Sequence, residues 1–140
     1  MKVLYHCSLL LFTAVTLIHA ENADPHKPIR LKCRSDLTLT PEALEAGASH
    51  PEDFGCYVSC FLQNIDIMDD KGVFDPAIAT QSVAEELREE SKPEIYACHE
   101  MRKNEPVDDL CKTAFGMINC LKERAPKLYE MLGIFRAPGN

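Results

Sequence analysis

The cysteines constrain the fold of this chain more than any other residue type. Seven occur in 140 residues, and six of them follow the spacing C-x22-C-x3-C-x37-C-x12-C-x8-C, with Cys7 apart from these. An even set in an oxidising compartment predicts a disulfide framework. Zinc is the alternative, but zinc sites bring ligands in close pairs such as C-x2-C, and here the close pair is C-x3-C with a lone His99 beside another cysteine. Three disulfides are therefore favoured.

Residues 1–20 have the pattern of a secretory signal peptide. Lys2 precedes an apolar run that ends at Ala20, a small residue of the kind found before cleavage points. A transmembrane anchor is the alternative, but polar residues interrupt the run, which falls short of about 20 continuous apolar residues. We therefore expect cleavage after Ala20, which removes Cys7, and a secreted, extracellular product with one domain over residues 21–140.

Charge and composition exclude several classes of protein. A net charge of −7 disfavours binding to nucleic acid or to anionic lipid, and no later segment is long and apolar enough for stable membrane insertion. With 46% apolar and 26% charged residues, the chain has the composition of a packed globular domain.

Apolar residues recur with helical spacing in the mature chain, and no segment alternates as a strand would. Thr40-Pro41-Glu42 is a start signal for a short helix, and a longer amphipathic helix is predicted over about 52–66. Prolines at the first helical position predict further helices that begin at Pro76, Pro93 and Pro106. The fold class is therefore all-α.

The C-terminal segment, about 126–140, is also apolar at helical spacing. It either covers the core or forms one wall or lid of a cavity, and the pattern alone does not distinguish these.

Helix geometry limits how the six cysteines pair. Of fifteen possible pairings, those that join Cys56 to Cys60 or Cys111 to Cys120 are excluded, because each pair lies on one predicted helix with side chains too far apart. Ten pairings remain.

The cysteine spacing resembles that of the insect odorant-binding proteins, above all in its x3 and x8 intervals. Asp70-Lys71-Gly72-Val73-Phe74 resembles the turn after the family's third helix, and Ala125-Pro126-Lys127-Leu128-Tyr129 resembles its C-terminal segment. The resemblance implies about six helices around an apolar cavity and a carrier of small hydrophobic ligands such as odorants or pheromones. It also implies three bridges, Cys33–Cys60, Cys56–Cys111 and Cys98–Cys120. Only twelve residues precede Cys33 in the mature chain, so the first helix is expected to be short.

The expected ligand-binding residues are the apolar side chains on the predicted helical stripes. Tyr129 is included as a polar group that could orient a ligand oxygen, and Leu132 and Phe135 are placed at the mouth. The full set is Phe54, Val58, Phe61, Leu62, Ile65, Phe74, Ile78, Val83, Leu87, Met101, Phe115, Ile118, Leu121, Tyr129, Leu132 and Phe135.

The sequence contains no recognisable catalytic motif or phosphate-binding loop, so we expect neither an enzyme nor a cofactor or metal site. His50 and His99 are either surface and packing residues or sensors of acidity that promote ligand release. Two other functions stay open, a disulfide-braced protein-interaction module without a cavity and a non-sensory lipophilic carrier. A membrane receptor is a further candidate partner, and the sequence does not distinguish a monomer from a homodimer.

Overall fold

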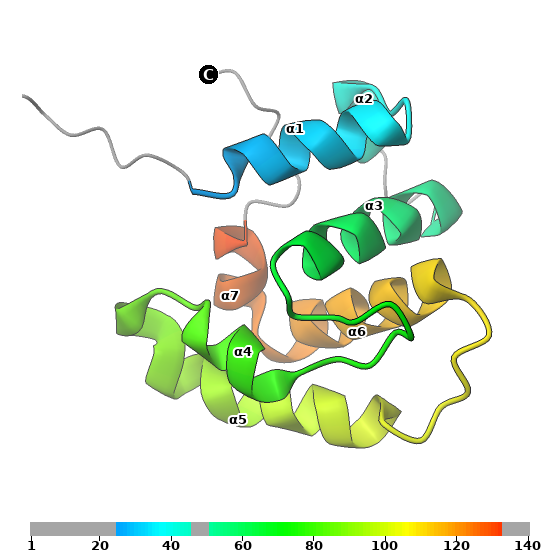
Figure 1. Ribbon diagram of the computed structural model, residues 1–140. Coiled ribbons are helices and arrows are strands. Elements are labelled where there is room, and N and C mark those ends of the chain that lie inside the picture. Colours follow the sequence, from blue (N-terminus) through cyan, green and yellow to red (C-terminus); the bar gives the residue numbers. More distant parts are fainter. Residues whose placement is uncertain (1–24, 46–50, 133–140) are drawn as a thin grey trace, which may run out of the picture.

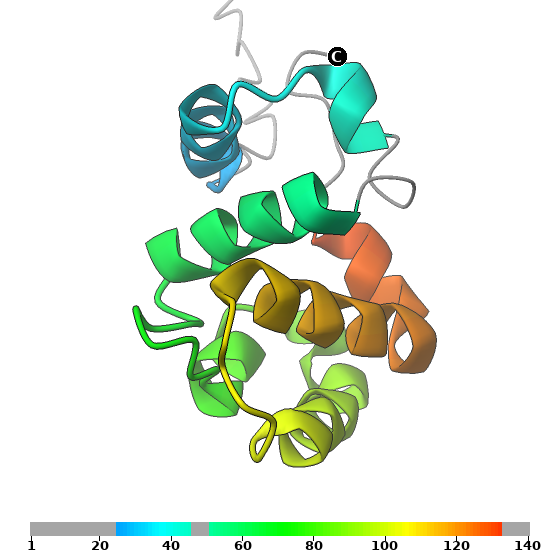
Figure 2. The ribbon, with the colours of Figure 1, turned by 90° about the vertical axis from the view of Figure 1, so that its right-hand side faces the viewer.

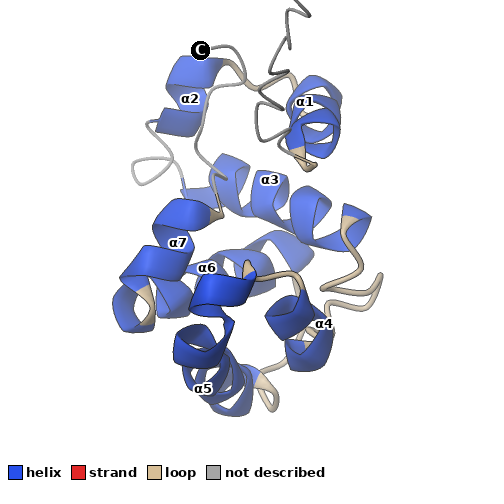
Figure 3. Ribbon diagram, turned by 90° about the vertical axis from the view of Figure 1, so that its left-hand side faces the viewer, coloured by secondary structure: helices blue, strands red, loops and turns tan. Residues whose placement is uncertain are grey.

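The computed structural model describes residues 25–45 and 51–132, and these contain seven helices and no named strand (Figures 1 and 3). The all-α prediction is confirmed. The helices are α1 (Lys27–Asp36), α2 (Pro41–Glu45), α3 (Pro51–Asn64), α4 (Pro76–Gln81), α5 (Glu85–Arg102), α6 (Leu110–Arg124) and α7 (Pro126–Met131). The predicted signal peptide, His50 and Phe135 lie outside the described residues.

The helices are arranged around a central pair, α3 and α6. These two share the most extensive helix–helix interface, with α1 and α2 on one side and α4 and α5 on the other (Figures 1 and 2). Gly55 allows this close approach, because a Cβ there would collide with the backbone carbonyl of Cys111. The central pair therefore fixes where the remaining helices pack.

Three disulfides join these helices in the pairing that the family resemblance implies. Cys33–Cys60 joins α1 to α3, Cys56–Cys111 joins α3 to α6, and Cys98–Cys120 joins α5 to α6. Every helix of more than six residues is thus linked covalently to the central pair.

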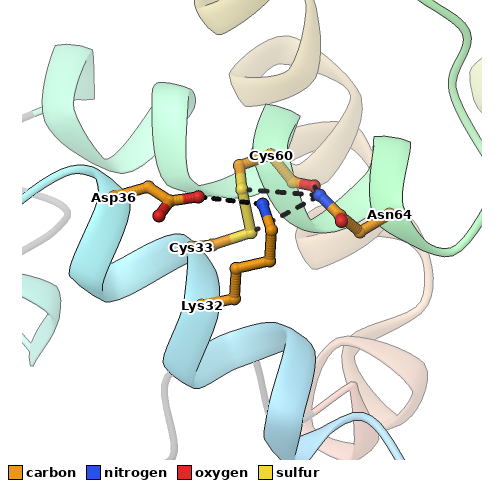
Figure 4. The surroundings of a disulfide bond; sticks show 5 residues. All are labelled: Lys32, Cys33, Asp36, Cys60 and Asn64. Atoms are coloured by element: carbon orange, nitrogen blue, oxygen red, sulfur yellow. Dashed lines mark hydrogen bonds and ion pairs between the residues drawn. A yellow bond between two sulfur atoms is a disulfide. The ribbon is translucent and has the colours of Figure 1, made fainter.

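The surroundings of the Cys33–Cys60 bridge are shown in Figure 4. Asn64, one turn after Cys60, donates from Nδ2 to the Cys60 carbonyl oxygen at 2.8 Å. On the other side of the bridge, Lys32 and Asp36 form an ion pair at 2.8 Å along the exposed face of α1. The last turn of α3 is therefore held against α1, which begins at Lys27 and has ten residues, as short as expected.

The segment between α3 and α4 is a tight turn. The Asp69 carboxylate accepts hydrogen bonds from the backbone N–H groups of Lys71 and Val73 at 2.9 and 2.7 Å, and Gly72 takes the left-handed conformation (φ 81°) that a glycine adopts without strain. A single bridge pairs Met68 with Phe74. The turn thereby brings Ile67 and Phe74 inward, where both are buried.

Two predicted helix boundaries are wrong. The helix that starts at Pro76 ends at Gln81, and α5 runs from Glu85 through Pro93 without a break, so Pro93 does not open a helix. Likewise α6 begins at Leu110 instead of Pro106, because the Asp109 side chain caps it by accepting from the N–H groups of Cys111 and Lys112.

Among the described residues no helix combines the length and apolarity that a membrane crossing requires. Within the same ranges, no three His, Cys, Asp or Glu side chains gather closely enough to hold a metal ion.

Candidate functional site

The described residues line a cavity of about 400 Å³ between the helices, and they leave it partly open to solvent. All helices except α2 contribute to its wall, together with residues just before α1, in the turn after α3 and between α4 and α5. The lining residues are Pro25, His26, Arg30, Phe61, Leu62, Ile65, Ile67, Phe74, Ala79, Ser82, Val83, Ala84, Ile95, Met117, Ile118, Leu121, Leu128 and Leu132.

Half of the residues that the sequence predicts for the site line this cavity. They come from the last turns of α3, the segment from the turn to α5, the middle of α6 and the end of α7. These residues are Phe61, Leu62, Ile65, Phe74, Val83, Ile118, Leu121 and Leu132. In the described part of the C-terminal segment, Leu128 and Leu132 line the cavity, and Leu128 is also part of the buried core.

Phe54, Val58 and Phe115 do not line the cavity, although they belong to the predicted stripes. Phe54 and Val58 are buried on α3 ahead of its last turns, and the Phe54 ring meets the Phe115 ring edge-on, with centroids 6.2 Å apart. Phe54 and Phe115 therefore pack across the α3–α6 interface, because the apolar stripe of α3 extends along the helix beyond the part that lines the cavity.

Four further predicted residues lie away from the cavity wall. Ile78 and Leu87 are half-buried against the core, whereas Met101 is 58% exposed near the end of α5. Tyr129 is half-buried on α7, and the Lys122 ammonium lies 5.6 Å from the centre of its ring. Partial burial raises the pKa of this phenol. Tyr129 therefore packs against the α6–α7 surface instead of facing the cavity.

The most informative residues that sequence reasoning missed are polar. Arg30, only 3% exposed, lines the cavity from the first turns of α1. His26 occupies the N-cap position of α1, and its ring meets the Phe61 ring edge-on, with centroids 5.8 Å apart. No periodic signal marks Arg30, because the apolar pattern of α1 is weak. Ile95, Met117 and Leu128, in contrast, lie on recognisable helical stripes.

Tyr57 belongs to α3 and is near the positive charges of α1. It is fully buried and does not line the cavity, and its hydroxyl has no hydrogen-bond partner within residues 25–45 and 51–132. Burial raises the pKa of this phenol to about 12, while the nearby positive charges of Arg30 and Arg34 act in the opposite direction. Tyr57 is therefore a neutral group beside two cations.

Two ion pairs near the surface link α6 and α7 to α5. Arg124 contacts Glu94 at 2.6 Å, and Lys127 contacts Glu90 at 2.9 Å, so the α6–α7 corner is joined to α5. Each such pair contributes at most about 1 kcal/mol. The disulfides, by comparison, are the stronger constraint on the cavity.

A second, smaller cavity of about 90 Å³ lies near the end of α5. His99, one of the two candidate acidity sensors, lines it and is stacked on Phe74 at 6.4 Å between ring centres. Because Phe74 also lines the main cavity, His99 is one residue removed from that cavity.

Comparison with known proteins gives consistent matches. Residues 18–124 match the PBP/GOBP family. General odorant-binding protein 19d of Drosophila melanogaster is 25% identical over 139 residues, which cover 89% of this chain and 93% of that protein. Odorant-binding protein 10 of Aedes aegypti is 26% identical over 81 residues, covering 58% of this chain and 55% of that protein.

Solved structures share the fold. The Locusta migratoria odorant-binding protein lmigOBP1 superposes with a TM-score of 0.69 at 26% identity, over 84% of this chain and 93% of that one. The medfly protein CcapOBP22/CcapOBP69a gives 0.61 at 19% identity, over 80% and 98% of the two chains. Odorant Binding Protein 7 of Anopheles gambiae, solved with an azo compound, gives a TM-score of 0.60 at 15% identity. The match covers 79% of this chain and 90% of that one. Since the family match spans most of the sequence, the chain belongs to the PBP/GOBP family of insect odorant-binding proteins.

Proposed function

We propose that this protein is a secreted, non-catalytic carrier that binds small hydrophobic ligands, such as odorants or pheromones, in its central cavity. The observation that carries the proposal is the cavity of about 400 Å³ inside so small a helical domain. Unfilled volume destabilises a protein core in proportion to its size. An apolar ligand that fills the cavity recovers this lost stability, so binding of such a ligand is favourable.

Burial accounts for a useful affinity without specific polar contacts. Covering about 300 Å² of a volatile's surface at about 25 cal/mol per Å² contributes roughly 7 kcal/mol. Before the cost of ordering the ligand, this corresponds to dissociation constants in the micromolar range.

The cavity also favours a carrier over a protein-interaction module, because an interaction module would be expected to have a solid core. The names of the Drosophila and Aedes relatives, both odorant-binding proteins, support the same choice. A non-sensory carrier would use the same cavity, and tissue expression would distinguish it from an olfactory one.

Two variants of α4 test the proposal. Ala79 lines the cavity, whereas Ala77, on the same helix, is exposed and does not. Ala79→Phe should place a ring in the cavity and reduce binding of a fluorescent hydrophobic naphthylamine dye at least tenfold, or about 1.4 kcal/mol. Ala77→Phe should bind the dye like the unmodified protein.

The thermal midpoint of both variants is measured beside the binding titration. A folded Ala79→Phe protein that binds the dye unchanged would contradict the cavity as the binding site. Failure of the unmodified protein to bind any of a panel of apolar volatiles would contradict the carrier function itself.

Secretion is tested separately, by expressing the full chain in insect cells. We expect the protein in the medium, with its N-terminus at Glu21 and no cysteine from the first twenty residues. Retention in the membrane fraction with an intact N-terminus would contradict this part of the proposal.

A further inference from the structure

Two cavities between the described helices share part of their walls. Phe74 and Met117 line both the main cavity of about 400 Å³ and the second cavity of about 90 Å³. We propose that Met117 is a movable partition between the two, and that one end of a long unbranched ligand displaces its side chain and enters the second cavity. This inference rests on the proposed carrier function and names Met117 as a residue that sets which chain lengths the protein accepts.

Phe74 is the fixed part of the partition. It pairs with Met68 across the turn after α3, and the backbone N–H of Asp75 donates to the Ile67 carbonyl oxygen at 2.8 Å. On the side of the second cavity, the Phe74 ring is stacked on His99, with centroids 6.4 Å apart. The backbone on both sides of Phe74 is thus held by hydrogen bonds, and its ring is supported by a neighbour.

Met117 is the part that yields. It is buried in the middle of α6, and a methionine side chain has three rotatable bonds and a polarisable sulfur, so it adapts to neighbours of different shape at low cost. Its movement requires no change in the α6 backbone, which the Cys56–Cys111 and Cys98–Cys120 bridges hold in place. A ligand can therefore open the partition by changing one side chain.

The second cavity suits the uncharged end of a hydrocarbon. Its arginine and its lysine both have acidic partners: Arg102 contacts Glu105 at 2.6 Å. Lys103 contacts Glu100 at 2.5 Å. Paired charges of this kind offer little attraction to a charged head group, whereas an apolar end gains from burial beside the Val107 side chain.

The partition selects the shape of a ligand as well as its length. Because Phe74 stays in place, displacement of Met117 opens a passage only as wide as one side chain. An unbranched hydrocarbon has about this cross-section, whereas a large ring does not. The ligand class is therefore a long unbranched chain.

The experiment measures how affinity depends on chain length, using the full secreted chain with its disulfides intact. Octanol, tetradecanol and cyclododecanol displace the naphthylamine dye at concentrations where each is monomeric. Thr113 lines the second cavity and not the main one, so Thr113→Phe should fill the second cavity alone. We expect this variant to bind tetradecanol about tenfold more weakly, since each methylene that stays buried is worth about fourfold in affinity. Its affinities for octanol and cyclododecanol should change less than about twofold.

Lys112→Phe is the matched control. Lys112 is the neighbouring residue on α6, is exposed and lines neither cavity. This variant introduces the same ring and should leave all three affinities unchanged. The thermal midpoint of each variant is measured beside the titrations.

Combined variants test the role of Met117 itself. Met117→Ala should strengthen binding of tetradecanol relative to octanol, because no side chain has to be displaced, and Thr113→Phe should cancel this effect in the double variant. Leu121 lines the main cavity and not the second one, so the effect of Leu121→Ala on tetradecanol should persist when Thr113→Phe is added. Equal coupling of Thr113→Phe to both alanine variants would contradict a partition at Met117.

A measurement on the unmodified protein guards against variants that do not fold. Tetradecanol labelled with ¹³C at its first and last carbons should show, at one end, nuclear Overhauser contacts to the His99 ring or the Val107 methyl groups, which line the second cavity and not the main one. Octanol labelled in the same way should show none. Absence of these contacts for tetradecanol, or an effect of Thr113→Phe that does not depend on chain length, would overturn the inference and leave the carrier function standing. If no alcohol binds and the apolar volatiles fail as well, the carrier function falls with it.

Discussion

Gly55 and Gly116 both lie inside helices, yet their neighbours differ. A Cβ at Gly55 would collide with the Cys111 backbone, whereas one at Gly116 would collide with the guanidinium of Arg102, the far end of a flexible side chain. Helix propensity alone would predict a gain of about 1 kcal/mol from alanine at either site. At Gly55, close packing where α3 crosses α6 turns this expected gain in stability into a loss.

Gly55→Ala should therefore destabilise the protein by about 1 to 3 kcal/mol, because the backbone at the helix crossing cannot move aside cheaply. Gly116→Ala should be close to neutral, since Arg102 can swing away at the expense of its exposed pair with Glu105. Urea unfolding without reductant measures both. Equal effects of the two substitutions would contradict the close crossing.

Tyr57 should make the free energy of unfolding decrease as the pH rises in the alkaline range. Its pKa is about 12 in the folded protein, against about 10 for an exposed phenol, so the unfolded chain loses this proton first. The stability that this difference contributes is complete below about pH 10 and is lost as the pH rises toward about 12. Tyr57→Phe should flatten the decline. It removes a buried hydroxyl that no described residue hydrogen-bonds, so stability near neutral pH should be unchanged or slightly higher.

The measurement is urea unfolding from about pH 7 to about pH 11, the range that brackets the onset of phenol ionisation. Tyr96→Phe, at a site 39% exposed on α5, is the control and should leave the alkaline decline unchanged. A decline in Tyr57→Phe as steep as in the unmodified protein would show that other groups cause it.

Apolar site residues were easier to predict from the sequence than polar ones. Phe61, Leu62 and Ile65 follow from the helical stripe of α3, because burial selects apolar side chains on one face. Arg30 could not be predicted in this way, since a buried arginine departs from the pattern on which the reasoning depends. The sequence also does not show which part of a stripe lines the cavity. Phe61 lines it and Phe54 does not, because of where α6 crosses α3.

At the level of elements, Pro93 is the residue that misled the sequence reasoning. Proline is common in the first turn of a helix, so a start was predicted there, but it lies in the middle of the 18-residue α5. Leu87, Ser91, Ile95 and Cys98 recur at helical spacing and are all at least half-buried. This continuous buried stripe indicates a single helix through residue 93. Packing along the stripe outweighs the tendency of Pro93 to interrupt the helix.

Pro93→Ala should stabilise the protein by about 1 to 2 kcal/mol. Alanine restores a backbone donor in α5, and the gain stays below the roughly 3 kcal/mol cost of a helix-interior proline because the unfolded chain becomes more flexible. Pro126→Ala is the control, because Pro126 begins α7 where proline is favoured, and it should bring no gain. Thermal unfolding compares the two, and a lower midpoint for Pro93→Ala would contradict the prediction.

For the molecule as a whole, the disulfides offset the cavity. Unfilled space in a protein core lowers stability by about 24 cal/mol per Å³, so a helical domain with a cavity has less stability from its core than one packed solid. The three bridges, with sequence separations of 27, 55 and 22, each contribute about 3 to 4 kcal/mol by constraining the unfolded chain, or about 10 kcal/mol together. Covalent links thus supply the stability that a solid core would otherwise provide.

Removing single bridges should separate stability from binding. Replacing Cys56 and Cys111 by alanine opens the longest loop and should cost about 0.8 kcal/mol more stability than replacing Cys98 and Cys120. The latter pair should weaken ligand binding more, because Ile95, Ile118 and Leu121 lie beside it and line the cavity. Urea unfolding and dye titration of both double variants test this, and the reverse order in both assays would contradict it.

Both ends of the described chain contribute to the cavity wall, Pro25 and His26 ahead of α1 and Leu132 after α7. None of these three positions is a cysteine or lies in the α3–α6 crossing. Ligand preference can therefore be altered by mutagenesis at the two ends while the cross-linked centre is kept. A combinatorial library restricted to these positions would be the most economical starting point for a vapour biosensor.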